Sequence, residues 1–180
     1  MFEMVKVVWM RARSRGRLRA APSVRVARGA RVHVAPGARV VLGAGVRLGP
    51  DARIDAVAGL VRVGSGASIG ERAVIIAHES VEIGARVAVG DWAALDDSAP
   101  TYDDVERPVR AQPLRTAPIR VGEGAVLGPH ASLGPGARVA AREAVPAYAV
   151  LPAPPKPPAA RGGAARPRPV RSARRRADGP

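Results

Sequence analysis

Histidines and a run of acids are the side chains in this sequence that could move protons near neutral pH. The histidines are His33, His78 and His130, and the chain contains no cysteine. We assign His33 and His130 to turns, and we expect both to be solvated surface residues. His78, in the stretch "IIAHESVEIG", is the best candidate for a general base, and a purely structural role is its alternative.

The acids lie in residues 96–112, "DDSAPTYDDVERPVRAQ". Asp97 could act as a base or orient a hydroxyl group of a substrate. A carboxylate with an ordinary pKa is a poor base for a hydroxyl unless it is desolvated, so we favour a solvated acidic loop. The histidines lie far apart in the sequence, and we predict no metal site.

These residues lie within a repeat. Six-residue units open on an aliphatic residue, as in "VGSGAS IGERAV", and small residues recur at the fifth position. The unit starts before the acidic stretch are Val63, Ile69, Ile75, Ile83, Val89 and Leu95, and those after it are Val121, Leu127, Leu133, Val139 and Val145. Residues 24–54 repeat more loosely, with steps of eight and then six residues.

A short fixed period predicts stacked coils. Each unit supplies a short strand and a tight turn, and its first aliphatic residue points inward onto the equivalent residue of the next coil. Small residues at the fifth position fit the corners of a narrow prism. Aromatic residues make up only 3% of the chain, so we expect a core of Val, Ile, Leu and Ala.

The basic residues concentrate at the two ends of the chain. Six basic residues and one acid give residues 1–20 a net charge of +5, and eight basic residues and one acid give residues 156–180 +7. Residues 21–155 carry only +2 of the total of +14. We expect residues 1–23 to form an N-terminal segment, with a short helix that covers one end of the coils or touches a membrane. We expect residues 24–151 to form the coils, with a protruding loop at 96–118, and residues 152–180 to be disordered.

No run is apolar and long enough to span a membrane, and the N-terminal charges follow the apolar stretch, so we expect a cytoplasmic protein. The Arg-rich tail has no aromatic residue to stack on bases, and weak non-specific anion binding is the most that we predict for it.

The repeat resembles the hexapeptide-repeat family of acyltransferases over roughly residues 24–156. The resemblance implies an all-β fold, a left-handed parallel β-helix. Residues 96–118 are similar to the protruding loop of the sugar and antibiotic O-acetyltransferase branch, with matches at Asp97, Tyr102, Asp103, Asp104, Pro108 and Gln112. The end "AVPAYAVLPAPPK" is similar to the family's closing motif, with Pro152 in place of a glycine.

The resemblance also locates a difference. Pro100 stands where the family has the loop histidine that takes the proton of the acceptor hydroxyl, and Val126 stands where it has a tryptophan. An "AHE" sequence such as that around His78 is frequent in the related branch ahead of the loop, which favours a structural role for this histidine.

The resemblance implies acetyl-CoA or another acyl-CoA as co-substrate, bound between the subunits of a homotrimer. Arg138, Arg142 and Lys156 are candidates to meet the CoA phosphates, and plain surface residues are their alternative. Two functions remain open: an acyl-CoA-dependent O-acyltransferase acting on a sugar or similar hydroxyl compound, or a catalytically inactive scaffold or binding protein. The acceptor cannot be named from the sequence.

Overall fold

The computed structural model describes residues 16–101, 106, 108 and 111–151. The predictions of an N-terminal helix, a disordered tail and a role for Lys156 concern residues outside this part of the chain. The described residues form strands and turns with almost no helix. None of their helical segments has the length and hydropathy required to cross a membrane.

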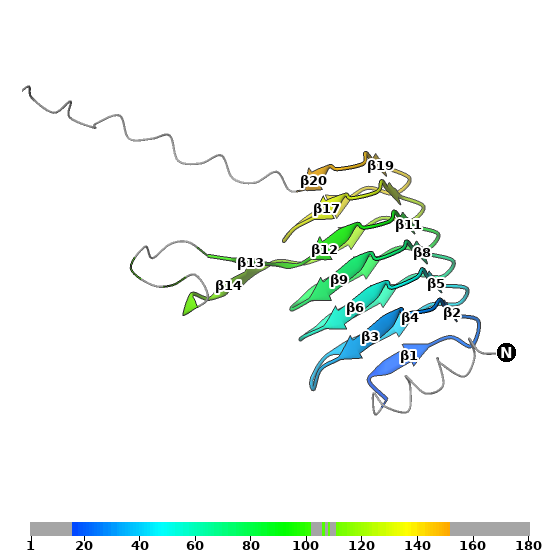
Figure 1. Cartoon of the computed structure of the whole chain (residues 1–180), viewed down its shortest axis with the longest axis horizontal. Helices are drawn as coiled ribbons and strands as arrows, with labels where there is room; N and C mark the ends of the chain where they lie inside the picture. The colour runs from blue at the N-terminus through cyan, green and yellow to red at the C-terminus, as the bar shows by residue number, and fades with distance from the viewer. Residues whose placement is uncertain (1–15, 102–105, 107, 109–110, 152–180) are drawn as a thin grey trace, which may run out of the picture.

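Three parallel sheets of six strands each form the sides of a prism (Figure 1). Sheet A contains, in spatial order, β1 (Leu18–Ala20), β4 (Arg39–Leu42), β7 (Leu60–Val63), β10 (Ser80–Ile83), β15 (Ile119–Val121) and β18 (Arg138–Val139). Sheet B contains β2 (Arg25–Val26), β5 (Arg47–Leu48), β8 (Ser68–Ile69), β11 (Ala88–Val89), β16 (Val126–Leu127) and β19 (Ala144–Val145). Sheet C contains β3 (Arg31–Val34), β6 (Arg53–Ala56), β9 (Val74–Ala77), β12 (Ala94–Asp96), β17 (Ser132–Leu133) and β20 (Val150–Leu151).

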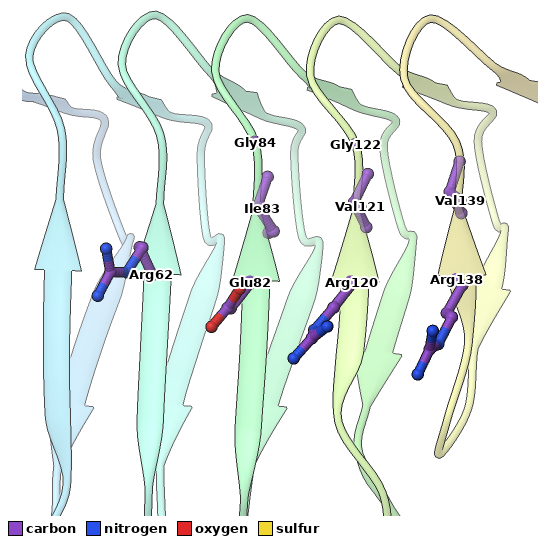
Figure 2. A pocket seen from close by; sticks show the side chains of 9 residues that line it. All are labelled: Arg62, Glu82, Ile83, Gly84, Arg120, Val121, Gly122, Arg138 and Val139. Atoms are coloured by element: carbon purple, nitrogen blue, oxygen red, sulfur yellow. The ribbon is translucent and has the colours of Figure 1, made fainter.

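The coil is left-handed. In Figure 2 the chain rises along the strand nearest the viewer from Glu82 to Gly84 and passes behind, while later coils follow to the right. The predicted left-handed parallel β-helix is therefore confirmed. The looser repeats at 24–54 keep the same three-sided cross-section, because β2 to β6 pair in register with the coils that follow.

The core is a column of aliphatic side chains. The predicted unit starts all point inward, and each of them, from Val63 to Val145, is at most 4% exposed. The small residues at the fifth position, among them Ala67, Ala73 and Ala131, are fully buried at the corners. Burying each Val, Leu or Ile side chain contributes about 1.5–3 kcal/mol, so stacking alone can hold a chain with so few aromatic residues together.

The two corners that border sheet C differ in length. The aromatic corner, which joins sheet B to sheet C, has four residues in every coil (27–30, 49–52, 70–73, 90–93, 128–131 and 146–149). The hairpin corner, which joins sheet C to sheet A, has four, three, two, 22 and four residues (35–38, 57–59, 78–79, 97–118 and 134–137). Over residues 24–54 the longer steps come from the strands, because β3 and β4 have four residues each and are followed by corners of four.

Two boundaries refine the predicted organisation. The first strand begins at Leu18, six residues before the predicted start of the coils, because Leu18 and Ala20 are buried against the coil that contains Val40 and Leu42. The loop at 96–118 begins and ends as an antiparallel hairpin of β13 (Ser98–Pro100) and β14 (Leu114–Thr116), which projects away from the prism (Figure 1).

Candidate active site

A buried carboxylate lies at the base of the hairpin. The Asp97 side chain is fully buried, and its two oxygens accept three backbone hydrogen bonds from the coil before. His78 N donates to Oδ1 over 2.7 Å, and the amides of Glu79 and Ser80 donate to Oδ2 over 2.8 and 2.7 Å. A carboxylate that accepts several amide hydrogen bonds is held in one orientation, so Asp97 fixes the place where the hairpin leaves the coils.

The local chain explains why three amides point at one group. The hairpin corner of this coil has only two residues, 78 and 79, so β9 turns directly into β10 and successive amides face the same point. The coil below is packed closely against the turn: a Cβ at Gly59, whose φ is +63°, would lie 1.9 Å from the carbonyl oxygen of Glu79. Glycine is therefore required at that position.

His78 stands next to this carboxylate. Its Nδ1 lies 3.7 Å from Asp97 Oδ1, and its side chain is 24% exposed. Nδ1 itself is buried and has no hydrogen-bond partner among the described residues. A proton on Nδ1 would face the carboxylate, and Nε2 would then carry the free lone pair.

Asp96 lies close to His78 and Asp97, and the three side chains form a small cluster of potential metal ligands. Its Oδ1 accepts hydrogen bonds from the amide and the hydroxyl of Ser98, at 2.9 and 2.7 Å. One donor atom from each of His78, Asp96 and Asp97 lies within 4.8 Å of the others, a spacing that could hold a cation. Three of the roughly four hydrogen bonds that the Asp97 carboxylate can accept come from backbone amides, which leaves little capacity for a metal ion.

The structure brings together two residues that the sequence proposed separately, His78 and Asp97. The expectation of a solvated acidic loop is wrong for Asp97, because its carboxylate is buried and accepts hydrogen bonds from backbone amides. Pro100, which the resemblance had aligned with a loop histidine, is exposed in β13 and pairs with Leu114 of β14. Gln112, another residue on which the loop resemblance rests, is buried at 9% exposure.

An open groove of about 360 Å³ runs across the outer face of sheet A (Figure 2). Arg62, Glu82, Arg120 and Arg138 stand in register on four neighbouring strands and line it. Figure 2 shows the Arg120 and Arg138 side chains projecting side by side. Within the described chain neither of these two arginines forms an ion pair, so this end of the groove is positively charged.

His78 lies in the turn that leads into β10, and Glu82 of β10 lines the groove. Glu82 lies four residues after His78, a span of at most roughly 13 Å in an extended chain. Of the predicted phosphate-binding residues, Arg138 lies in the groove, whereas Arg142 lies at the turn after β18 and does not line it. Arg120 is a groove residue that sequence reasoning missed, and its place one regular coil before Arg138 was the signal that could have found it.

The other histidines lie elsewhere. His33 is exposed as expected, but it lies within strand β3 and not in a turn, because it takes an outward position of that strand. His130 is at the aromatic corner, where its ring stacks between Trp92 (centroids 6.0 Å apart) and Tyr148 (4.8 Å). Arg72 lies 4.8 Å over the Trp92 ring, so this corner carries a continuous stack across four coils. His130 is therefore a packed residue on the surface and not merely a solvated one.

Comparisons with known proteins give only weak similarity, and that to solved structures. No family model and no curated protein matches the chain. A hexapeptide-repeat-containing acetyltransferase from Vibrio cholerae O1 biovar eltor, solved in complex with acetyl coenzyme A, is similar at 16% identity with a TM-score of 0.49. The match covers 68% of this chain and 65% of that one, which is less than two thirds of its length. A similarity this low carries no argument about the activity of this chain.

Proposed function

We propose that this protein is an acyl-CoA-dependent O-acyltransferase, with acetyl-CoA as the acyl donor and a sugar or similar hydroxyl compound as acceptor. The observation that carries the proposal is the pairing of His78 with the buried Asp97 at the base of the hairpin, in the turn that leads into β10, a strand that lines the arginine groove. The resemblance of the repeat and the hairpin to O-acetyltransferases supports the same reaction.

His78 acts as the general base. Asp97 faces Nδ1 and keeps the ring oriented, which leaves Nε2 to take the proton from the acceptor hydroxyl. The hydroxyl oxygen then attacks the thioester carbonyl, the carbon–sulfur bond breaks, and the protonated imidazole returns its proton to the departing thiolate. The products are the acyl ester and free coenzyme A. In this account Asp97 is a positioning residue.

The groove on sheet A binds the phosphates of the co-substrate. Arg120 and Arg138 can each form charge-assisted hydrogen bonds with phosphate oxygens. An extended thioester lying along sheet A from these arginines toward the hairpin corner would bring its carbonyl to His78. Arg142 and Lys156, which we predicted for the same role, are left out of this minimal site.

A homotrimer is part of the proposal. The hairpin extends away from its own prism, and β14 is exposed along its whole length, with Leu114 50% exposed. A neighbouring subunit would cover this strand and enclose the groove. Light scattering at three times the chain mass of 18.6 kDa would support the trimer, and a monomeric mass would overturn it.

A second candidate function rests on Pro100. Proline can neither accept nor donate a proton at the place where the resemblance expects the base. Together with Val126, which is 48% exposed, it favours a scaffold that has kept the coils and lost the reaction.

Thiol release separates the two functions. The full chain is incubated with acetyl-CoA and a pool of free and nucleotide-linked sugars, and free coenzyme A is titrated with a thiol reagent. Release that depends on the sugar pool supports the transferase. If the rate stays at that of acetyl-CoA alone with every acceptor tried, the scaffold function is favoured.

A further inference from the structure

The first two coils carry exposed arginines on all three faces of the prism, in matching positions on two of them. In sheet B, Arg25 pairs in register with Arg47, and in sheet C, Arg31 pairs with Arg53. Sheet A presents Arg19 in the first coil and Arg39 in the second, out of register, because Arg19 pairs with Val41. We call these six exposed residues the arginine ring: Arg19, Arg25, Arg31, Arg39, Arg47 and Arg53.

The ring stops abruptly at the third coil. The next residues in the same columns are Leu60 after Arg39, Ser68 after Arg47 and Val74 after Arg53. Residues 16–53 hold eight arginines and one aspartate, for a net charge of +7, whereas residues 54–101 hold three arginines and seven acids, for −4. On sheets B and C the positive charge therefore lies at one end of the prism, whereas sheet A carries further arginines, Arg62, Arg120 and Arg138, in the groove.

This arrangement is electrostatically unfavourable for the isolated chain. Coils stack about 4.8 Å apart, and like charges directly opposite one another on parallel strands repel. Asp55 binds Arg53 and raises the pKa of that guanidinium, but among the described residues no acid pairs with Arg25, Arg31, Arg39 or Arg47. An external anionic partner would relieve the repulsion.

We infer that the arginine ring docks this end of the prism onto an anionic lipid surface. A plane laid against the end is within about one Debye length of both coils, so arginines from all three faces act together on it. A linear polyanion such as a nucleic acid would run along one face of the prism. On sheets B and C, the positions that follow the two arginines in register are occupied by small or apolar residues, beginning with Ser68 and Val74.

The sequence just before the ring fits the same partner. Residues 1–15 read "MFEMVKVVWMRARSR", in which Phe2 and Trp9 accompany Lys6 and three arginines. Apolar and aromatic residues next to basic ones are typical of segments that bind at the membrane interface. The inference does not depend on the proposed acyltransferase reaction.

Vesicle co-sedimentation of the full chain tests the inference. Vesicles of phosphatidylcholine with one quarter phosphatidylglycerol are compared with pure phosphatidylcholine, at low and at high salt. The triple variant R25Q/R31Q/R47Q should bind the anionic vesicles about 100-fold more weakly than the wild type. The matched variant R86Q/R115Q/R142Q removes the same number of exposed arginines outside the ring, and it should bind nearly as well as the wild type.

Three results would overturn the inference. They are equal loss in both triple variants, which would indicate a response to net charge alone; unchanged binding in the ring variant; and a ring-dependent affinity for a 20-base-pair DNA duplex that exceeds the affinity for the vesicles. Circular dichroism melts of both variants show that each is folded, and because thiol release is measured separately, failure here leaves the proposed reaction untouched.

Discussion

The hairpin corner and the aromatic corner are built from the same stacked coils, yet they differ in length and in where their polar and aromatic side chains lie. The aromatic corner keeps four residues in every coil and stacks side chains on its outside, from Arg72 through Trp92 and His130 to Tyr148. The hairpin corner varies from two to 22 residues and places a carboxylate inside. A solenoid can therefore hold one corner constant for stability and vary another to build a site.

Each corner also has an aspartate whose carboxylate accepts hydrogen bonds from backbone amides of the coil before it. Asp97 accepts three while fully buried, and Asp91 at the aromatic corner accepts one, from Glu71 N at 2.8 Å, while exposed. We expect Asp97→Ala to lower the free energy of unfolding by at least about 3 kcal/mol, because three amides lose a buried partner. Urea unfolding should show a loss of only about 1 kcal/mol for Asp91→Ala. Equal losses would mean that the two corners do not differ in this respect.

The histidines at the two corners should differ in their effect on turnover. His78→Ala should lower turnover by 10²- to 10⁴-fold, the range that a general base supplies, with little change in melting temperature. His130→Ala, at the aromatic corner, should keep turnover within a factor of about two. Steady-state thiol release checks both variants, and an active His78→Ala enzyme would remove this histidine from the mechanism.

The smallest expected effect concerns the aromatic stack. Trp92→Ala removes both the ring contact with His130 and the cation–π contact with Arg72, and should cost about 1 kcal/mol of stability. Acetyl-CoA binding should not change, because the stack lies at the corner between sheets B and C, whereas the groove lies on sheet A. A loss of binding without loss of stability would contradict the separation of the two corners.

The repeat itself could be predicted because its signal is local. Val63, Ile69 and Ile75 are six residues apart, and their inward direction follows from strand geometry alone. The arrangement around Asp97 could not be predicted, since its partners are backbone amides 17 to 19 residues earlier, which leave no side-chain pattern in the sequence.

The aromatic stack was hidden for a different reason. Trp92 and His130 are neighbours in space, but the hairpin insertion separates them in the sequence, and only His130 and Tyr148 keep the regular coil step. Aligning the coils strand by strand, with residues 97–118 treated as an insertion, would have placed Trp92, His130 and Tyr148 at equivalent positions. Arg120 and Arg138 in the groove lie one such coil apart, and the same alignment pairs them with Glu82 and Arg62 from before the insertion.

Calorimetric titration of the full chain with acetyl-CoA is the decisive experiment, because it requires no knowledge of the acceptor. We expect micromolar-range binding by the wild type. We expect at least about 10-fold weaker binding by R120Q/R138Q, and unchanged binding by R72Q/R86Q, which removes two exposed arginines outside the groove. No detectable heat with the wild type, or equal binding by both double variants, would contradict the assignment of the sheet A groove to an acyl-CoA.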